Sequence, residues 1–389
     1  MRTGVRVRDL ENLKRKQMMS QKEKYKRAAK GDIAYNMMRM WQGAVGPAPV
    51  DGLVSPAYVV VKPYPQTNST YFSYLFRTAA YMQEVNKFSR GIVADRNRLY
   101  WESFKQMPSL VPPRPEQDQI VAYLRAQDAH IARYLKAKRE LIGLMAEQRG
   151  VLAERAISAV DTQYLRFDRV VTLLATPITR EPEVTYRPIG MFNRGRGIFH
   201  KSPTEGKHLG DSTFFQIEKG DLIFSGQFAW EGAVAIANAK DDGCIASHRY
   251  PIAKCKLDAV TPEYLYTFFL SKTGDLLLNH HSRGAAGRNR PLNPRSLSKE
   301  KIPVPPLQLQ REVSDFFYEE QSVRREIENE ITLIREYRDR LIADVVTGQI
   351  DIRGWQPGPD DVVNDEDLAA LGDDEECEES AEEDDDGAD

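Results

Sequence analysis

The chain has 389 residues, 41% hydrophobic and 29% charged, which is typical of a soluble globular protein with two or three domains. The last 30 residues hold 17 of the 57 acidic residues and none of the 54 basic ones, so residues 1–359 carry a net charge of +14. A basic body favours contact with a polyanion. Three cysteines without a CxxC pair exclude a disulfide framework. No apolar run reaches the ~18 residues of a membrane span and no signal peptide opens the chain, so a cytoplasmic protein without membrane contact is expected.

Residues 1–111 are predicted to form a first mixed α/β domain. Its recognisable marks are Lys30-Gly31-Asp32, Trp41-Gln42-Gly43-Ala44-Val45 and Arg90-Gly91. The stretch from Met1 to Ala29 is rich in Lys and Arg and poor in apolar residues. Because such a stretch supplies no strand with a buried face, the domain is expected to be shortened at its N-terminus and marginally stable by itself.

Residues 112–160 are predicted to form a long central helix. Pro112-Pro113 prevents a helix from continuing out of the preceding domain. Beyond them apolar residues recur in steps of three and four, which predicts a seam that packs on another helix. The seam positions are Leu124, Ile131, Leu135, Ile142, Met145, Leu152 and Ala156, with Lys138 and Arg149 interrupting them.

Residues 161–304 are predicted to form a second α/β domain that repeats the marks of the first. Lys219-Gly220-Asp221 and Trp230-Glu231-Gly232-Ala233-Val234 lie 189 residues after their counterparts. Arg283-Gly284 lies 193 residues after Arg90-Gly91. Short strands between Gly, Asp and Asn turns precede a helix start at Thr261-Pro262-Glu263. Matches in the same order at nearly constant offset indicate a tandem duplication.

Residues 305–350 are predicted to form a second long helix after Pro305-Pro306, and residues 351–389 an acidic disordered tail. Since one globular core cannot cover helices of this length, the two helices are expected to pack on each other. The tail is interpreted either as a solubilising end or as a DNA mimic that screens the basic body. The second seam comprises Val313, Phe317, Ile327, Ile331, Ile334, Leu341 and Val345, with Arg324 and Arg338 interrupting it.

This order of segments resembles the specificity subunit of type I restriction–modification enzymes. The closest stretches are Pro305-Pro306-Leu307-Gln308-Leu309-Gln310, which opens the second helix, and Leu341 to Asp351, which closes it. The first helix has similar stretches at Pro112 to Gln117 and at Ala156 to Val160. The resemblance covers residues 25–355. It implies an α+β fold: a tandem duplication of an α/β target-recognition domain plus long helix, with the two helices forming an antiparallel coiled coil.

The resemblance also implies a function. Each recognition domain would read half of a bipartite site in double-stranded DNA. Methyltransferase subunits that use S-adenosylmethionine would bind the helices, and ATP-dependent restriction subunits would join the complex. The chain itself is expected to be non-catalytic and to hold no cofactor or metal, and it carries no Asn-Pro-Pro-aromatic motif, GxxxxGK[ST] loop or HExxH motif.

Two alternatives stay open. The chain could be a duplicated coiled-coil protein-interaction scaffold without sequence-specific DNA reading. It could also be a stand-alone nuclease, which the missing constellation of metal-binding carboxylates disfavours.

The strongest candidate for DNA contact is the segment from Ser282 to Leu292. Its candidate side chains are Arg283, Arg288, Asn289 and Arg290, and the Arg-Asn-Arg run matches Arg96, Asn97 and Arg98 in the first domain. Guanidinium and amide groups can pair with guanine and adenine edges or hold phosphates. The alternative interpretation is a solvated basic surface turn.

Further candidates are weaker. Glycine and arginine alternate between Gly190 and Lys201, which indicates a mobile basic loop with Arg194 and Arg196 as contacts, or equally a disordered linker. Gln227 is a possible reader of adenine. Trp41 and Trp230 are expected to be core anchors rather than base-stacking groups, and Cys244 and Cys255 core thiols.

Overall fold

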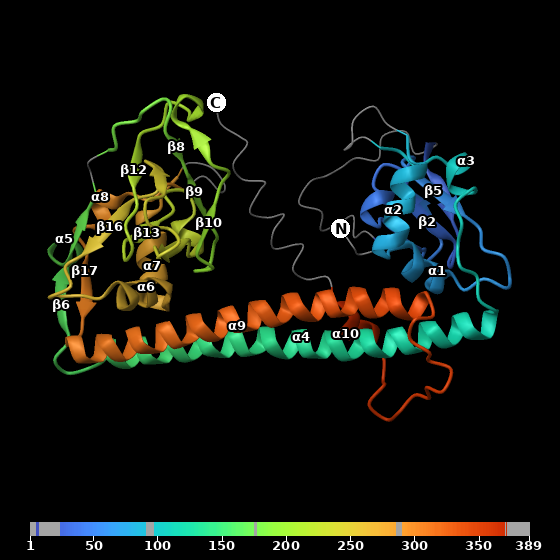
Figure 1. Cartoon of the computed structure of the whole chain (residues 1–389). Coiled ribbons are helices and arrows are strands. Elements are labelled where there is room, and N and C mark those ends of the chain that lie inside the picture. The colour runs from blue at the N-terminus through green and yellow to red at the C-terminus, as the bar shows by residue number, and fades with distance from the viewer. Residues whose placement is uncertain are drawn as a thin grey trace. The chain divides into compact units, whose positions relative to one another are not determined.

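The computed structural model describes residues 5–7, 24–90, 97–174, 177–284, 290–369 and 371 (Figure 1). The chain divides into two compact units: unit 1 contains residues 1–139 and 327–389, and unit 2 contains residues 140–326. The division crosses both long helices, α4 (Arg114–Ile157) and α9 (Leu307–Val346), so each unit holds part of each helix. None of the helices in the described ranges has the length and apolar character needed to cross a membrane.

Unit 1 contains a three-stranded antiparallel sheet in the order β3-β2-β5. Ile33 in β2 faces Pro47 in β3 and Val61 in β5. A second pair of strands joins β1 to β4. Helices pack on the sheet around Tyr35, Met40 and Tyr71, which are fully buried. The elements before α4 are β1 (Lys26–Ala28), β2 (Ile33–Asn36), η2 (Met40–Gln42), β3 (Val45–Pro47), β4 (Gly52–Val54), β5 (Tyr58–Val61), α1 (Ser69–Phe76), α2 (Ala79–Phe88) and α3 (Trp101–Phe104).

Unit 2 repeats this arrangement and extends it. Its main sheet has the order β14-β13-β16-β7, α6 lies against β13 and β14, and α7 packs on α6 (Figure 1). Short pairs of strands join β9 to β10, β8 to β11 and β12 to β15. A second core cluster around Ile217 and Ile223 combines residues of β9, β10 and β15 with residues of the main sheet. The elements are β6 (Gln163–Arg166), α5 (Phe167–Val170), β7 (Val171–Leu173), β8 (Thr185–Tyr186), β9 (Ile189–Met191), β10 (Ile198–His200), β11 (Thr204–Glu205), η4 (Gly206–His208), β12 (Phe214–Gln216), β13 (Leu222–Phe224), η5 (Ala229–Glu231), β14 (Val234–Ile236), β15 (Ile245–Ser247), β16 (Ile252–Cys255), α6 (Pro262–Leu270), α7 (Lys272–His281), α8 (Pro294–Leu297) and β17 (Lys301–Val304).

The predicted duplication is visible in local hydrogen bonds. Asp32 accepts from the backbone N–H of Ala29 at 2.9 Å, and Asp221 accepts from that of Glu218 at 2.8 Å. The short helices η2 and η5 both end at a glycine in the left-handed region, Gly43 (φ +79°) and Gly232 (φ +72°). A residue without Cβ adopts this conformation at little cost, so the repeated Trp-x-Gly sequence encodes a repeated turn.

A buried glutamine in each repeat ties the helix-forming part of its domain to the long helix that follows. Gln310 accepts from the N–H of Thr261 at 2.8 Å and donates to the carbonyl of Pro305 at 2.8 Å. Gln117 accepts from the N–H of Asn68 at 2.8 Å and donates to the carbonyl of Pro112 at 2.7 Å. Thr261 and Asn68 cap α6 and α1. We refer to Gln117 and Gln310 with these partners as the glutamine clamps.

Three of the four cations that interrupt the predicted seams are paired across the two helices, and the fourth, Arg324, pairs with Glu320 on its own helix. In unit 1, Arg338 on α9 donates to Asp128 on α4 at 2.6 and 3.0 Å, and Lys138 pairs with Glu330 at 2.6 Å. In unit 2, buried Arg149 on α4 pairs with buried Glu320 on α9. Higher numbers on α4 meet lower numbers on α9, so the helices run antiparallel in each unit, as the resemblance implied. Removing one partner of such a buried pair typically costs 3–5 kcal/mol.

The expectation of a disordered tail from residue 351 onward is wrong for its first part. Ile352 is buried in the core of unit 1, and Trp355 packs edge-on against Tyr123 of α4 with ring centroids 5.3 Å apart. Asp361 contacts His130 at 2.9 Å. Ile352 and Trp355 bury apolar surface ahead of the acidic run. They were assigned to the tail because most of the residues that follow them are acidic. A short helix, α10 (Asp365–Ala369), follows.

Candidate nucleic-acid interface

Three segments of unit 2 meet around η5, in the connection between β13 and β14. They are the turn between β9 and β10, the loop from Ser225 to Gly232, and the end of α7 (Asn279–Arg283) together with the segment Arg290–Asn293 that bonds to it. The N–H of Leu292 donates to the carbonyl of Gly226 at 2.7 Å, and that of Gly195 to the carbonyl of Gly232 at 2.8 Å. These bonds join stretches up to about a hundred residues apart in the sequence into one surface.

The turn between β9 and β10 is a hairpin with hydrogen bonds to η5 and α6, and the mobility expected of the Gly-Arg loop stays a prediction. Arg194 has a left-handed backbone (φ +56°), a conformation that no other non-glycine residue in the described ranges adopts. Its N–H donates to the carbonyl of Glu231 at 3.0 Å. Tyr266 donates to the carbonyl of Gly195 at 2.7 Å. Backbone strain held in place by such contacts is a frequent feature of functional sites.

The two hairpin arginines have exposed side chains. The guanidinium of Arg196 lies over the ring of Phe192 at 5.2 Å, and its Nε donates to the carbonyl of Asn193 at 3.2 Å. Asn193 in turn donates to the carboxylate of Glu231. The sequence pattern identified the arginines but missed Asn193, Glu231 and Tyr266, whose contacts arise only in the tertiary structure.

Arg290 is stacked on Trp230. Its guanidinium carbon lies 4.8 Å from the centre of the indole ring, and its Nε donates to the carbonyl of Ser282 at 3.3 Å. Trp230 is half-buried and is not among the hydrophobic residues packed on either core cluster of unit 2, whereas Ala229 beside it is fully buried. Trp230 thus packs on Arg290 and outside both core clusters, which differs from the core position that was expected.

Arg283 is exposed and lies at the end of α7. Its Nε donates to the carbonyl of His280 at 3.1 Å. His281 beneath it contacts Ser296 at 2.8 Å and Glu300 at 3.3 Å, and burial lowers its pKa. Gln227 is half-buried, and its carbonyl accepts from the indole N–H of Trp230 at 3.0 Å. The structure thus brings Arg194, Arg196, Gln227, Arg283 and Arg290 together, while Arg288 and Asn289 lie outside the described residues.

The corresponding region of unit 1 has the same backbone plan. The N–H of Leu99 donates to the carbonyl of Met37 at 2.8 Å, which matches the bond from Leu292 to Gly226. Arg90 and Arg98 are exposed and exchange two backbone hydrogen bonds of 3.0 Å. Asn97 is half-buried, and Arg96 lies outside the described residues. Trp41 packs against the core of unit 1, as expected.

This geometry corrects the alignment of the Arg-Asn-Arg runs. The sequence placed Arg98 opposite Arg290, but Leu99 and Leu292 occupy equivalent positions. Leu99 lies nine residues after Arg90, and Leu292 lies nine residues after Arg283, so the two segments have the same length. Pro291 therefore stands at the position of Arg98, and Arg290 at the position of Asn97.

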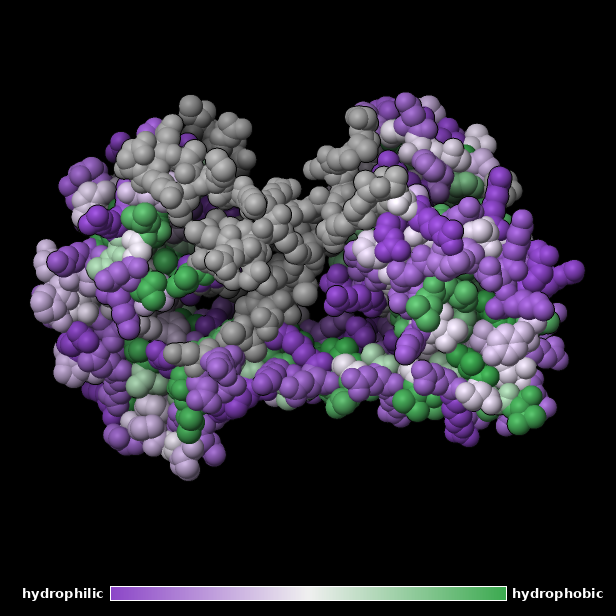
Figure 2. All heavy atoms as spheres, turned by 180° about the vertical axis from the view of Figure 1, so that it is seen from behind, coloured by the Kyte–Doolittle hydropathy of each residue, from purple (hydrophilic) through white to green (hydrophobic). Residues whose placement is uncertain are grey.

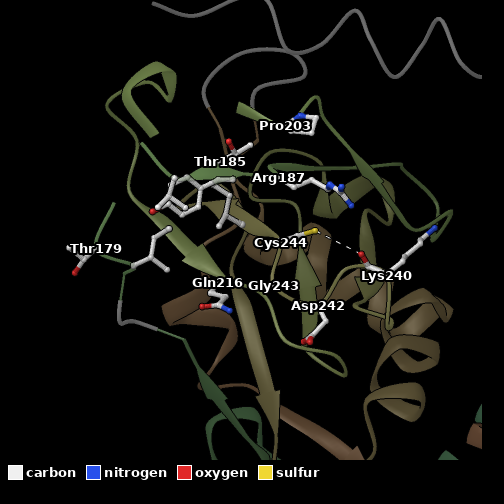
Figure 3. Close-up of a pocket in the computed structure, with 13 residues that line it drawn as sticks. Thr179, Thr185, Arg187, Pro203, Gln216, Lys240, Asp242, Gly243 and Cys244 are labelled. Atoms are coloured by element: carbon white, nitrogen blue, oxygen red, sulfur yellow. Dashed lines mark hydrogen bonds between the residues drawn. The ribbon is translucent and has the colours of Figure 1, made fainter. Parts of the chain in front are cut away.

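A separate cavity of about 720 Å³ lies at the opposite end of β13 and β14. Figure 3 shows it bordered by Thr185, Arg187 and Gln216 and by the turn from Lys240 to Cys244. Burial raises the pKa of Cys244, and burial raises that of Cys255 to about 12, as expected for core thiols. Across the described ranges no three His, Cys, Asp or Glu side chains are grouped to hold a metal ion.

No protein-family model matches the sequence. No curated protein matches it either. Among solved structures, a chain of a type I R-M system, studied for its complex assembly and conformational transition, is 14% identical, with a TM-score of 0.53 over 86% of each chain. The HsdS subunit from Thermoanaerobacter tengcongensis is 14% identical (TM-score 0.41, covering 83% of this chain and 82% of that one). The S subunit of a type I restriction-modification system from M. genitalium is 12% identical (TM-score 0.40, covering 83% and 84%). The first similarity shows that this chain has the fold of a chain from a type I restriction–modification system, as the resemblance predicted.

Proposed function

We propose that this chain is a cytoplasmic, non-catalytic specificity subunit that directs methyltransferase and restriction subunits of a type I restriction–modification complex to a bipartite site in double-stranded DNA. The observation that carries the proposal is the meeting of four arginines from separate segments, Arg194, Arg196, Arg283 and Arg290, around η5 of unit 2. The shared fold supports it, since the similar structure is of a type I R-M system. We further propose recognition domains at residues 1–111 and 161–304, and helical spacers at 112–160 and 305–350.

The arrangement suits DNA in two ways. Exposed arginines such as Arg194, Arg196 and Arg283 can neutralise phosphates, which supplies affinity but little sequence preference. Arg290 and Gln227 carry groups that pair with base edges in the major groove. Because several hydrogen bonds fix the loops that present them, little order would have to be created on binding.

In each unit, the parts of the long helices carry exposed apolar side chains that could bind the proposed methyltransferase partners. On the part of α4 in unit 2, Leu141, Leu144 and Val151 are 41%, 61% and 66% exposed. On the part of α9 in unit 1, Leu333 and Tyr337 are 64% and 52% exposed. Figure 2 shows hydrophobic areas scattered over an otherwise hydrophilic face. Exposed apolar side chains at helical spacing are typical of partner contacts. Such side chains would equally serve a plain interaction scaffold, so they do not distinguish the two functions.

The decisive experiment maps methylated bases across the genome of a host that carries this gene with its methyltransferase partner, and of the same host without the gene. A split methylated motif that depends on the gene is expected. Arg194→Ala with Arg290→Ala should lose or relax one half of the motif. Arg311→Ala, an exposed arginine on α9, is the matched control and should leave the motif unchanged.

Methylation that is identical with and without the gene would contradict the proposed function. If the chain still co-purifies with the methyltransferase under those conditions, the scaffold alternative is favoured instead.

A further inference from the structure

Building on the proposed function, we propose that Trp230 is a positioning residue that presents the guanidinium of Arg290 to one guanine in the half-site read by unit 2. The stack of these two side chains would then set the base preference at a single position. Neither Trp230 nor its indole face was assigned a role in DNA reading by the sequence pattern.

The tryptophan is held from two sides. Its indole N–H donates to the carbonyl of Gln227 at 3.0 Å, and its own carbonyl accepts from Asn279 of α7 at 3.3 Å. The helix η5 ends at once in Gly232, whose N–H donates to the carbonyl of Ala229 at 2.9 Å. The ring is therefore fixed before any ligand arrives, which is the property a platform requires.

The arginine is held along its backbone and at its Nε. Two residues beyond Arg290, the N–H of Leu292 donates to the carbonyl of Gly226, and Pro291 between them has a restricted φ. The Nε of Arg290 donates to the carbonyl of Ser282, a residue that is itself fully buried. The chain path and one edge of the guanidinium are thus fixed.

The remaining edge of Arg290 has the geometry for a base. With Nε bonded to Ser282, the two terminal nitrogens are left, and no residue in the described ranges accepts from them. A pair of parallel N–H donors matches the O6 and N7 acceptors of guanine, the commonest specific contact of arginine in the major groove. Stacking on an aromatic face is compatible with this, because the donors lie in the guanidinium plane.

The two repeats use the same tryptophan differently. In unit 1 the indole N–H of Trp41 donates to the carbonyl of Met38 at 3.1 Å, as in unit 2, but Trp41 packs against the core. Asn97 stands at the position of Arg290. A tryptophan with a purely structural role is expected to pack alike in both repeats. We therefore attribute the different packing of Trp230 to its contact with Arg290.

The test is selection of binding sites from random DNA by the intact complex, followed by sequencing. Trp230→Leu removes the π face, Trp230→Phe keeps one, and Arg290→Lys keeps the charge but loses the paired donors. We expect Trp230→Leu and Arg290→Lys to weaken the preference for guanine at the same single position of the site. The discrimination against other bases there should fall on the order of tenfold. Trp230→Phe should retain most of it, and affinity for non-specific DNA should stay unchanged. Trp41→Leu is the matched control and should leave that position unaffected.

Several outcomes overturn the inference. One is that the variants weaken binding equally on all DNA sequences. Another is that Trp230→Leu and Arg290→Lys relax different positions of the site, and a third is that Arg290→Lys keeps full selectivity. If Trp230→Leu does not fold, the comparison of Arg290→Lys with Trp230→Phe decides. If the wild-type complex selects a split site and the substitutions at Trp230 and Arg290 leave that site unchanged, the inference is rejected but the proposed function stands. A wild-type complex that selects no sequence rejects the proposed function.

Discussion

At the residue scale, glycine positions decide whether the candidate interface can assemble. Gly195 lies in the β9–β10 turn with φ +64°, and a Cβ there would lie 2.5 Å from Cδ1 of Leu270 and 2.7 Å from the hydroxyl of Tyr266. The hairpin can therefore approach α6 only because this residue has no side chain. Its neighbour Arg194 takes its orientation from that close approach.

Gly195→Ala is expected to displace the hairpin from η5. A left-handed alanine and the two contacts together should cost about 1–3 kcal/mol of stability and weaken DNA binding by unit 2. The measurements are denaturant unfolding and DNA affinity at fixed salt concentration. Gly210→Ala is the control, since no atom lies within 4 Å of its Cβ position and its φ is not positive. Equal behaviour of the two variants would contradict the role given to Gly195.

At the element scale, the glutamine clamps join each domain to the helix that leaves it. Gln310 is fully buried and Gln117 is 1% exposed. Each amide satisfies a backbone N–H at a helix cap and the carbonyl of the first proline of the Pro-Pro pair. A proline pair cannot extend the helix upstream, so the amide replaces hydrogen bonds that the backbone loses at this junction.

Gln117→Leu and Gln310→Leu should each destabilise the unit that contains the substitution by about 1–3 kcal/mol, because buried backbone groups lose their partners. Hydrogen exchange should show faster exchange of the Asn68 amide in the first variant and of the Thr261 amide in the second. Gln308→Leu, at an exposed position two residues before Gln310, should change neither. Loss of protection in both units from one substitution would show that the clamps do not act separately.

At the scale of the whole molecule, the two units differ in their sheets, and the acidic residues are concentrated at the C-terminal end. Unit 2 has a second core cluster and a fourth strand in its main sheet, whereas the described part of unit 1 has a three-stranded sheet. Residues 372–389 hold 12 acidic side chains and no basic ones. If these 12 side chains were neutral, the net charge of the chain would rise from −3 to +9. A body of that charge would attract any nucleic acid.

Replacing those 12 acidic residues by Asn and Gln should raise affinity for non-specific DNA on the order of tenfold at low salt and steepen its salt dependence. The selected sequence should not change. A variant with the same acidic residues in shuffled order should behave as the wild type. Retention on heparin at several salt concentrations is the measurement, and no difference between the neutral and acidic variants would leave the tail as a solubilising end.

The sequence by itself determined the repeated architecture. Proline pairs, the Trp-x-Gly turns and the three- and four-residue spacing of apolar residues are local signals, and the duplication showed each of them twice. They predicted the α+β class and the paired long helices, whereas the candidate arginines Arg194, Arg283 and Arg290 came from the Gly-Arg and Arg-Asn-Arg patterns. Seam cations such as Arg149 and Arg338 were visible as interruptions, but their acidic partners were not.

Only the tertiary structure decided how these parts meet. The β9–β10 hairpin is held by Tyr266 and Glu231, which lie far from it in the sequence, and the stack of Arg290 on Trp230 joins residues 60 positions apart. The packing of Ile352 and Trp355 on unit 1 was hidden by the acidic residues that follow them. In each case a few long-range contacts override a local composition, because the free energy of burying an apolar or stacked group does not depend on its distance along the chain.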